Sequence, residues 1–151
     1  MKQIFNVNQD KKILLLQALF ITAMLLANID GIKIIKIGPV NTSVGILLVP
    51  LAFLITDVLA EVKGKKFVAN LIWSTVIVLI FSYLFIKLSI NVEPADRFKD
   101  MNPAFVSVFN SSSRMFLASI VAFMLSQFHD IWAFEFWKEK TKGKMLWLRN
   151  N

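Results

Sequence analysis

The chain has 151 residues, no cysteine and one histidine, with 56% hydrophobic residues and a formal net charge of +7 at pH 7. Its mean hydropathy of +0.62 indicates a membrane protein, and the absence of cysteine excludes disulfides, thiolate metal sites and cysteine nucleophiles. The positive charge does not indicate a nucleic-acid partner, because the basic residues lie between apolar runs and form no recognisable nucleic-acid module.

The first two predicted elements are a membrane helix and a short hairpin. Residues 13–29 are apolar and uncharged, and their length is at the lower edge of what spans a bilayer. This run follows two lysines but lacks a convincing signal-peptide cleavage site, so we interpret it as a retained first helix. Residues 31–43 alternate in polarity around Gly38 and Pro39, which predicts a short extended hairpin outside the bilayer.

Further apolar segments follow the hairpin. Residues 44–60 predict a second helix that Pro50 kinks or loosens by one turn. Residues 67–86 predict a third helix without a charged residue. After a polar loop, residues 104–109 predict a short interfacial or re-entrant piece, and residues 111–136 predict a fourth helix that a lysine-rich tail follows.

Lysine and arginine are distributed unevenly between the two predicted sides of the membrane. The N-terminal segment, the connection between the second and third helices and the C-terminal tail together carry eleven, whereas the remaining connections carry five. The positive-inside rule therefore predicts a cytoplasmic N-terminus. We expect residues 1–151 to form a single integral membrane domain, an all-α polytopic membrane helix bundle.

Two carboxylates, Asp57 and Glu61, lie one helical turn apart near the end of the second apolar run. Moving an ionised carboxylate into hydrocarbon costs about 2.5 to 3.5 kcal/mol at a helix centre and less near its end, so a partner or a ligand is expected. At positions i and i+4 both project from one helix face, where they could converge on a ligand or cation. The alternative is an acidic pair at the helix end bonded to Lys63, Lys65 or Lys66.

Other polar and aromatic residues in the apolar runs are further candidates for a binding pocket. Arg114 either snorkels to the outer interface or donates to an acceptor on a ligand. Gln127 and Asp130 share one face of the fourth helix, and interhelical hydrogen bonding is the alternative to ligand contact there. Asn28 ends the first helix, where a capping role is the simplest alternative, and Trp73 either packs in the core or stacks on a ligand.

Four sequence segments occur in a specific order: residues 54–66 (LITDVLAEVKGKK), 113–119 (SRMFLAS), 126–130 (SQFHD) and 141–151 (TKGKMLWLRNN). Together they resemble the queuosine precursor transporter family, also called the vitamin uptake transporter family. The resemblance implies a bacterial inner-membrane protein that imports 7-deazaguanine precursors of queuosine. It also implies a six-helix transporter fold, of which about four spanning helices are expected here and the C-terminal ones are lacking.

The same resemblance implies roles for the candidate residues. A carboxylate such as Asp57 or Asp130 would accept the adjacent N–H donors of a guanine-like edge. Arg114 would face the ring carbonyl, and Trp73 would cover the flat face of the ring. The amides that would complement the carboxylate are Asn28 and Gln127. At the end of the second helix, Ala60 and Lys63 depart from the family pattern, which expects an asparagine-like residue and an aromatic one there.

The sequence leaves the mechanism of transport open. Movement around Pro50 would gate the pocket, and coupling to protons, facilitated diffusion and docking on a separate energising module all remain alternatives, as does a homo-oligomer. No nucleotide-binding loop of the Walker type occurs, and we expect no metal and no cofactor. Two other functions compete with transport. One is a membrane-embedded enzyme that uses Asp57 and Glu61, and the other is a non-transporting membrane interaction protein.

Overall fold

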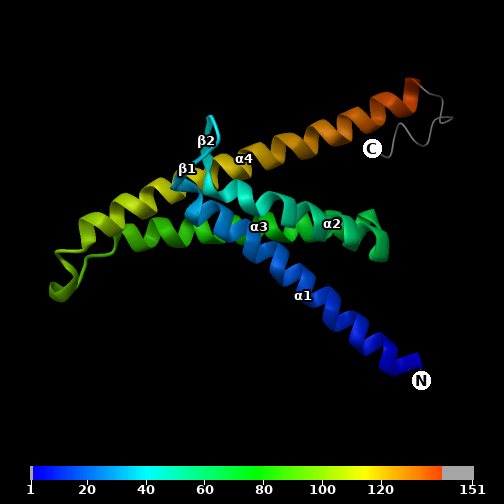
Figure 1. The fold of residues 1–151 in the computed structure, drawn as a ribbon, viewed down its shortest axis with the longest axis horizontal. Helices are drawn as coiled ribbons and strands as arrows, with labels where there is room; N and C mark the ends of the chain where they lie inside the picture. Colours follow the sequence, from blue (N-terminus) through cyan, green and yellow to red (C-terminus); the bar gives the residue numbers. More distant parts are fainter. Residues whose placement is uncertain (1, 141–151) are drawn as a thin grey trace. The chain divides into compact units, whose positions relative to one another are not determined.

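The computed structural model describes the backbone of residues 2–140 and the side chains of residues 10–125. The chain divides into two units, residues 1–117 and residues 118–151. The elements of the first unit, shown in Figure 1, are α1 (Lys2–Ile29), η1 (Asp30–Ile32), β1 (Ile34–Ile37), β2 (Val40–Ser43), η2 (Val44–Leu48), α2 (Val49–Lys63), α3 (Lys65–Asn91) and η3 (Asp96–Phe98). Helix α4 (Asn102–Lys140) begins in the first unit. Its residues from 118 onward belong to the second unit and are the part of that unit that the structure describes.

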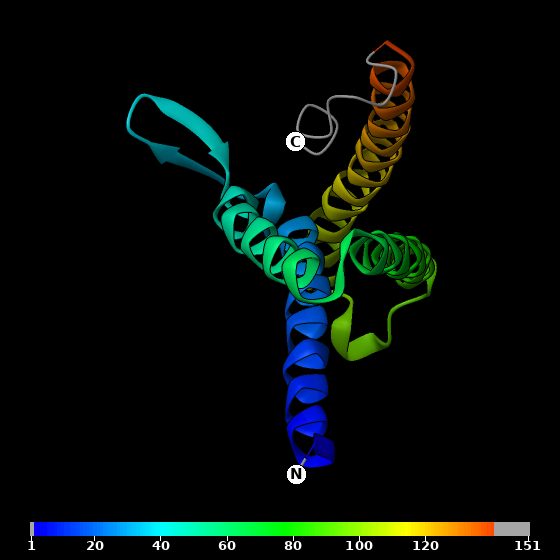
Figure 2. The same cartoon turned by 90° about the vertical axis from the view of Figure 1, so that its right-hand side faces the viewer.

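The predicted hairpin between the first two long helices is confirmed. Strands β1 and β2 pair antiparallel with Ile37 opposite Val40, and the chain reverses through Gly38 and Pro39. Gly38 has a φ of 59°, a conformation that favours glycine because it has no Cβ. Figure 2 shows the hairpin projecting away from the neighbouring helices of the first unit.

Two predicted helix boundaries are wrong. Residues 44–48 form a separate 3₁₀ turn, η2, and α2 begins at Val49 with Pro50 in its first turn, where the missing N–H removes no helical hydrogen bond. The turn before Pro50 thus departs from α-helical geometry, and α2 is one continuous helix from Val49 to Lys63. Residues 104–109 do not form a separate piece, because they lie in α4, which begins at Asn102 and not at residue 111.

Helices α1, α2 and α3 pack together through one apolar core. Its buried residues come in pairs from the three helices: Ile13 and Phe20, Ile55 and Leu59, Val68 and Leu71. Between α2 and α3 the single residue Gly64 has a φ of 86°, which lets the chain turn sharply from one helix into the next. This turn brings the end of α2 and the start of α3 against the first half of the α1 span.

Four helical segments in the described part of the chain are long and apolar enough to cross a membrane: Asp10–Ile32, Val44–Lys63, Lys65–Asn91 and Asn102–Leu125. Outside the core their large apolar side chains are exposed, with Leu14 64%, Phe53 66% and Ile77 67% accessible. Such surfaces suit lipid, because acyl chains are as apolar as leucine. The architecture is therefore that of a multi-pass helical membrane protein, as predicted.

The core predicts a difference between two identical substitutions on α2. Leu59 is fully buried and Leu54 is 61% exposed. Leu59→Ala leaves a cavity and should lower the free energy of unfolding by about 2 to 5 kcal/mol, whereas Leu54→Ala should change it by less than about 0.5 kcal/mol. Unfolding by SDS titration in mixed micelles measures both values. Equal values for the two variants would contradict the assignment of the core.

Candidate functional site

The two carboxylates of α2 lie on its exposed face. Asp57 and Glu61 are both exposed, whereas Ile55 and Leu59 point into the core. Thr56 directly precedes Asp57, and its hydroxyl donates to backbone carbonyls of its own helix, 3.2 Å to Ala52 and 2.9 Å to Phe53. We call Asp57 and Glu61 the acidic pair.

Neither member of the acidic pair has an ion-pair partner among the side chains of residues 10–125. The sequence alternative named Lys63, Lys65 or Lys66 as partners of this pair, and of these the Lys63 Nζ atom lies 3.7 Å from Asp10 Oδ1 of α1. Both carboxylates thus remain available to a ligand or to another polar group.

A second polar region lies where the end of α1 meets η2 and α4 within the first unit. The Ser43 hydroxyl donates to the Gly31 carbonyl at 2.7 Å and accepts from Gly45 N at 3.1 Å. The fully buried Ser112 hydroxyl of α4 donates to the Ile29 carbonyl at 3.0 Å. These bonds satisfy carbonyl groups near the end of α1 that have no partner within the helix. We call Asn28, Ser43 and Ser112 the polar junction.

Asn28, predicted as a cap or a pocket residue, is 2% exposed and lies in the last turn of α1. Its Nδ2 atom donates to the Met24 carbonyl at 2.7 Å. Its Oδ1 atom is buried and accepts no hydrogen bond from the described residues. A buried acceptor of this kind costs free energy unless a donor reaches it, so Asn28 Oδ1 is suited to receive an N–H or O–H group.

Small residues make the polar junction possible. A Cβ atom on Gly45 would lie 2.7 Å from the backbone oxygen of Ala27, so only glycine allows η2 to approach α1 so closely. At Gly31 a Cβ atom would lie 3.3 Å from Ser43 Oγ and 3.4 Å from Met115 Cε. The sequence reasoning did not identify this junction, although glycines and consecutive serines in apolar runs are a known sign of close helix contact.

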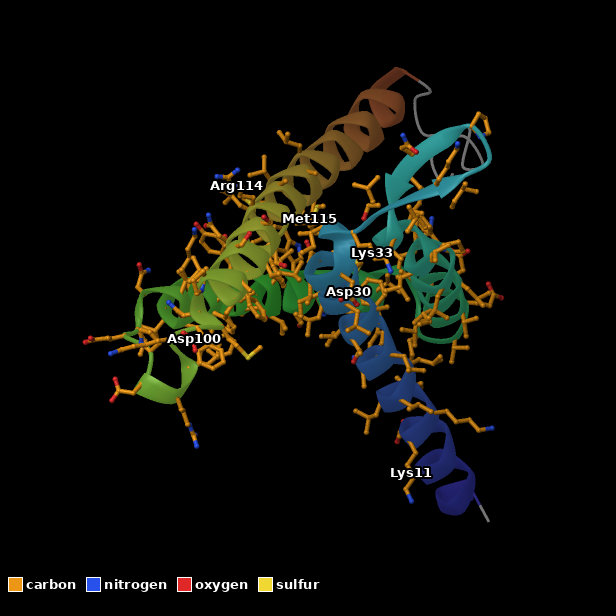
Figure 3. The ribbon with its side chains drawn as sticks, turned by 60° about the vertical axis from the view of Figure 1, so that its left-hand side comes forward. Lys11, Asp30, Lys33, Asp100, Arg114 and Met115 are labelled. Carbon is orange, nitrogen blue, oxygen red and sulfur yellow. The ribbon has the colours of Figure 1, made fainter. Side chains whose placement is uncertain are left out.

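Arg114 and Met115 leave α4 in different directions. Met115 reaches Gly31, whereas Arg114 is exposed and in Figure 3 points away from the end of α1. Because α4 begins at Asn102 and not at residue 111, Arg114 lies roughly 18 Å along the helix and not near its start as predicted. Its guanidinium has no partner among the described side chains.

Trp73 of α3 is 45% exposed, so its ring is not packed in the core. Trp73 and Asp57 each follow a core residue, Leu71 and Ile55, by two positions. Two positions correspond to roughly 200° around a helix, so both side chains project away from the core that α2 and α3 share. The described residues therefore do not bring Asp57 and Trp73 together.

The acidic pair and the polar junction are also separate. Asp57 lies twelve residues after Gly45, roughly 18 Å or more along η2 and α2. Gln127 and Asp130 lie within helix α4, but the structure describes side chains only for residues 10–125, which does not include theirs. Across residues 10–125 no group of three or more His, Cys, Asp or Glu side chains could hold a metal ion.

The candidate spans of the described residues, two of which carry Asp57 and Arg114, define the class as a multi-pass membrane protein. The family model described as "Putative vitamin uptake transporter" matches residues 43–151, and the chain belongs to this family. It is therefore a vitamin-type uptake transporter with a small-molecule substrate and a lipid environment, and the family expectation from the sequence is confirmed. No curated protein and no solved structure matches the chain.

The polar junction predicts that two glycines respond differently to the same change. Gly45→Ala must separate η2 from the backbone of Ala27 and should lower the free energy of unfolding by about 1 to 3 kcal/mol. Gly31→Ala meets only the movable ends of Ser43 and Met115 and should cost less. SDS titration of both purified variants tests the order, and a larger loss for Gly31→Ala would contradict the close approach at Gly45.

Proposed function

We propose that this transporter imports a 7-deazaguanine precursor of queuosine. The family membership supports uptake of a small molecule, and the sequence resemblance carried jointly by residues 54–66, 113–119, 126–130 and 141–151 supports this particular cargo. The observation that carries the proposal is the acidic pair: two carboxylates one turn apart, inside a candidate span and without an ion-pair partner among residues 10–125. A guanine-like edge offers adjacent N–H donors, which a carboxylate accepts through both oxygens.

Asp57 is the stronger acceptor of the two because of its depth. The span Val44–Lys63 ends six residues after Asp57 and two after Glu61. At about 1.5 Å per residue, Asp57 lies roughly 9 Å inside the end of the span, whereas Glu61 lies at its edge. The free-energy cost of an ionised carboxylate without a partner is larger at greater depth in the bilayer. A cargo that donates hydrogen bonds therefore stabilises Asp57 more than Glu61.

The other candidate residues have complementary chemistry. Arg114, unpaired among the described residues, would donate to the ring carbonyl, and the exposed ring of Trp73 would offer a flat face for stacking. Asn28 would supply its buried acceptor. Gln127 and Asp130 keep the roles that the sequence resemblance implies.

Since Asp57 and Trp73 point away from the shared core, a pocket that includes both needs a movement or a further element between them. The boundary between η2 and α2 is a natural hinge, because the 3₁₀ geometry of η2 changes there to the α-helical geometry of α2. A homo-oligomer or a separate energising module would supply the further element instead.

Uptake of labelled precursor tests the role of Asp57. In cells without their own importer, Asp57→Asn should lower uptake about 10- to 100-fold, because a neutral amide accepts fewer and weaker hydrogen bonds than a carboxylate. Asp96→Asn makes the same change on the exposed residues between α3 and α4 and should leave uptake unchanged. Unchanged uptake for Asp57→Asn at equal membrane levels would remove Asp57 from the binding site.

Orientation is part of the same proposal: the N-terminus is cytoplasmic and the membrane is the bacterial inner membrane. The chain has no cysteine, so a single introduced cysteine reports one position. A membrane-impermeant maleimide should label Asn41→Cys of the hairpin in intact spheroplasts, and Lys66→Cys of α3 only after permeabilisation. Labelling in the reverse order would place the N-terminus outside.

A further inference from the structure

Five exposed lysines gather at one end of the first unit. They are Lys11, Lys12, Lys63, Lys65 and Lys66, and we call this region the basic end. The start of the α1 span and the connection between α2 and α3 meet there, since Ile13, Leu59 and Val68 share the core and Asp10 Oδ1 lies 3.7 Å from Lys63 Nζ. Among residues 10–125 two carboxylates, Asp10 and Glu61, lie beside these lysines, and a positive excess remains even when Lys65 is not counted.

The opposite end of the same unit is nearly balanced. Its basic side chains are Lys33, Lys36, Lys87, Arg97 and Lys99, and its acidic ones are Asp30, Glu93, Asp96 and Asp100. Two of these cations also have a partner: Lys99 pairs with Asp96 at 2.7 Å, and Lys87 donates to Asn110 Oδ1 at 3.1 Å. Within residues 10–125 the excess of positive charge is thus concentrated at the basic end.

Below the lysines of α1 runs an exposed apolar stripe. Leu14, Leu15 and Leu19 are 64%, 59% and 43% accessible. Leu15 follows Lys11 by four positions and Lys12 by three, so it lies next to both on the helix surface. Figure 3 shows Lys11 projecting from α1 near its N-terminal end. The lysines lie at the edge of a membrane span, and the exposed leucines follow them along the helix. This arrangement suits an amphiphile, whose anionic head would contact the lysines and whose apolar tail would contact the leucines.

We propose that the basic end binds an anionic phospholipid. Lys11, Lys12 and Lys66 hold the headgroup phosphate, and an acyl chain lies along Leu14, Leu15 and Leu19. A lipid is the occupant that the geometry favours, because the lysines lie at the end of membrane spans where headgroups are found and basic pockets between helices on that level bind phosphate-bearing lipids. The lysine stems extend the apolar surface while their ammonium groups reach the phosphate. This site does not depend on which substrate is carried.

Native mass spectrometry of the full chain, released from nanodiscs of phosphatidylcholine and phosphatidylglycerol, tests the site. The triple variant Lys11→Gln, Lys12→Gln, Lys66→Gln should retain about 100-fold less phosphatidylglycerol, because each lysine near an anionic surface contributes roughly fivefold in affinity. The matched control Lys33→Gln, Lys36→Gln, Arg97→Gln removes three charges at the balanced end and should retain the lipid as the unaltered chain does. Circular dichroism confirms that both variants keep their helices.

Every outcome of this experiment decides the proposal. Loss of phosphatidylglycerol in the first variant alone supports it. Equal retention by all three chains, or equal retention of phosphatidylcholine and phosphatidylglycerol, would overturn it. Displacement of the lipid by millimolar inorganic phosphate would show that the lysines bind phosphate without regard to the acyl chain and would overturn the lipid assignment. Retention of an acidic protein in place of lipid during purification would do the same.

Discussion

Backbone groups in hydrocarbon have no water to bond, and this constraint governs the whole chain. Each long apolar segment must satisfy its own N–H and C=O groups, which it does as a helix. The places where the helix ends or changes, at η1 and η2, need other partners, and there the hydroxyls of Ser43 and Ser112 bond the carbonyls of Gly31 and Ile29. The polar junction is therefore what allows a hairpin to leave the bundle between two membrane spans.

The same constraint explains why the exposed charges within the spans are informative. Apolar side chains such as Phe53 and Ile77 face outward at no cost in lipid, whereas Asp57 and Arg114 do so without a partner among residues 10–125. These two groups are the ones that we propose to bind a cargo with hydrogen-bond donors and acceptors. Charge at the edge of the spans has a different use, since the lysines of the basic end lie at headgroup level.

The polar groups of the first unit thus fall into three regions, of which the acidic pair and the basic end adjoin at Glu61. The acidic pair offers carboxylate acceptors, the polar junction joins α1, η2 and α4, and the basic end carries an excess of positive charge among the described residues. Gly45 connects the polar junction to helix packing, because its lack of a Cβ lets η2 lie close to Ala27 of α1. Movement at the boundary of η2 and α2 would carry the acidic pair together with the core residues Ile55 and Leu59, because all four lie on α2.

The sequence alone determined the four spanning segments, the hairpin and the family, because length, apolar content and ordered motifs are local properties that need no contacts to be recognised. It misplaced the N-terminal boundaries of α2 and α4, since a proline in a first turn and a proline inside a helix look alike in sequence. Only the tertiary structure decided that Asn28 and Ser112 are buried and that Asp57 and Trp73 project away from the core. Which face of a helix meets its neighbours depends on how whole helices pack, and no single segment contains that information.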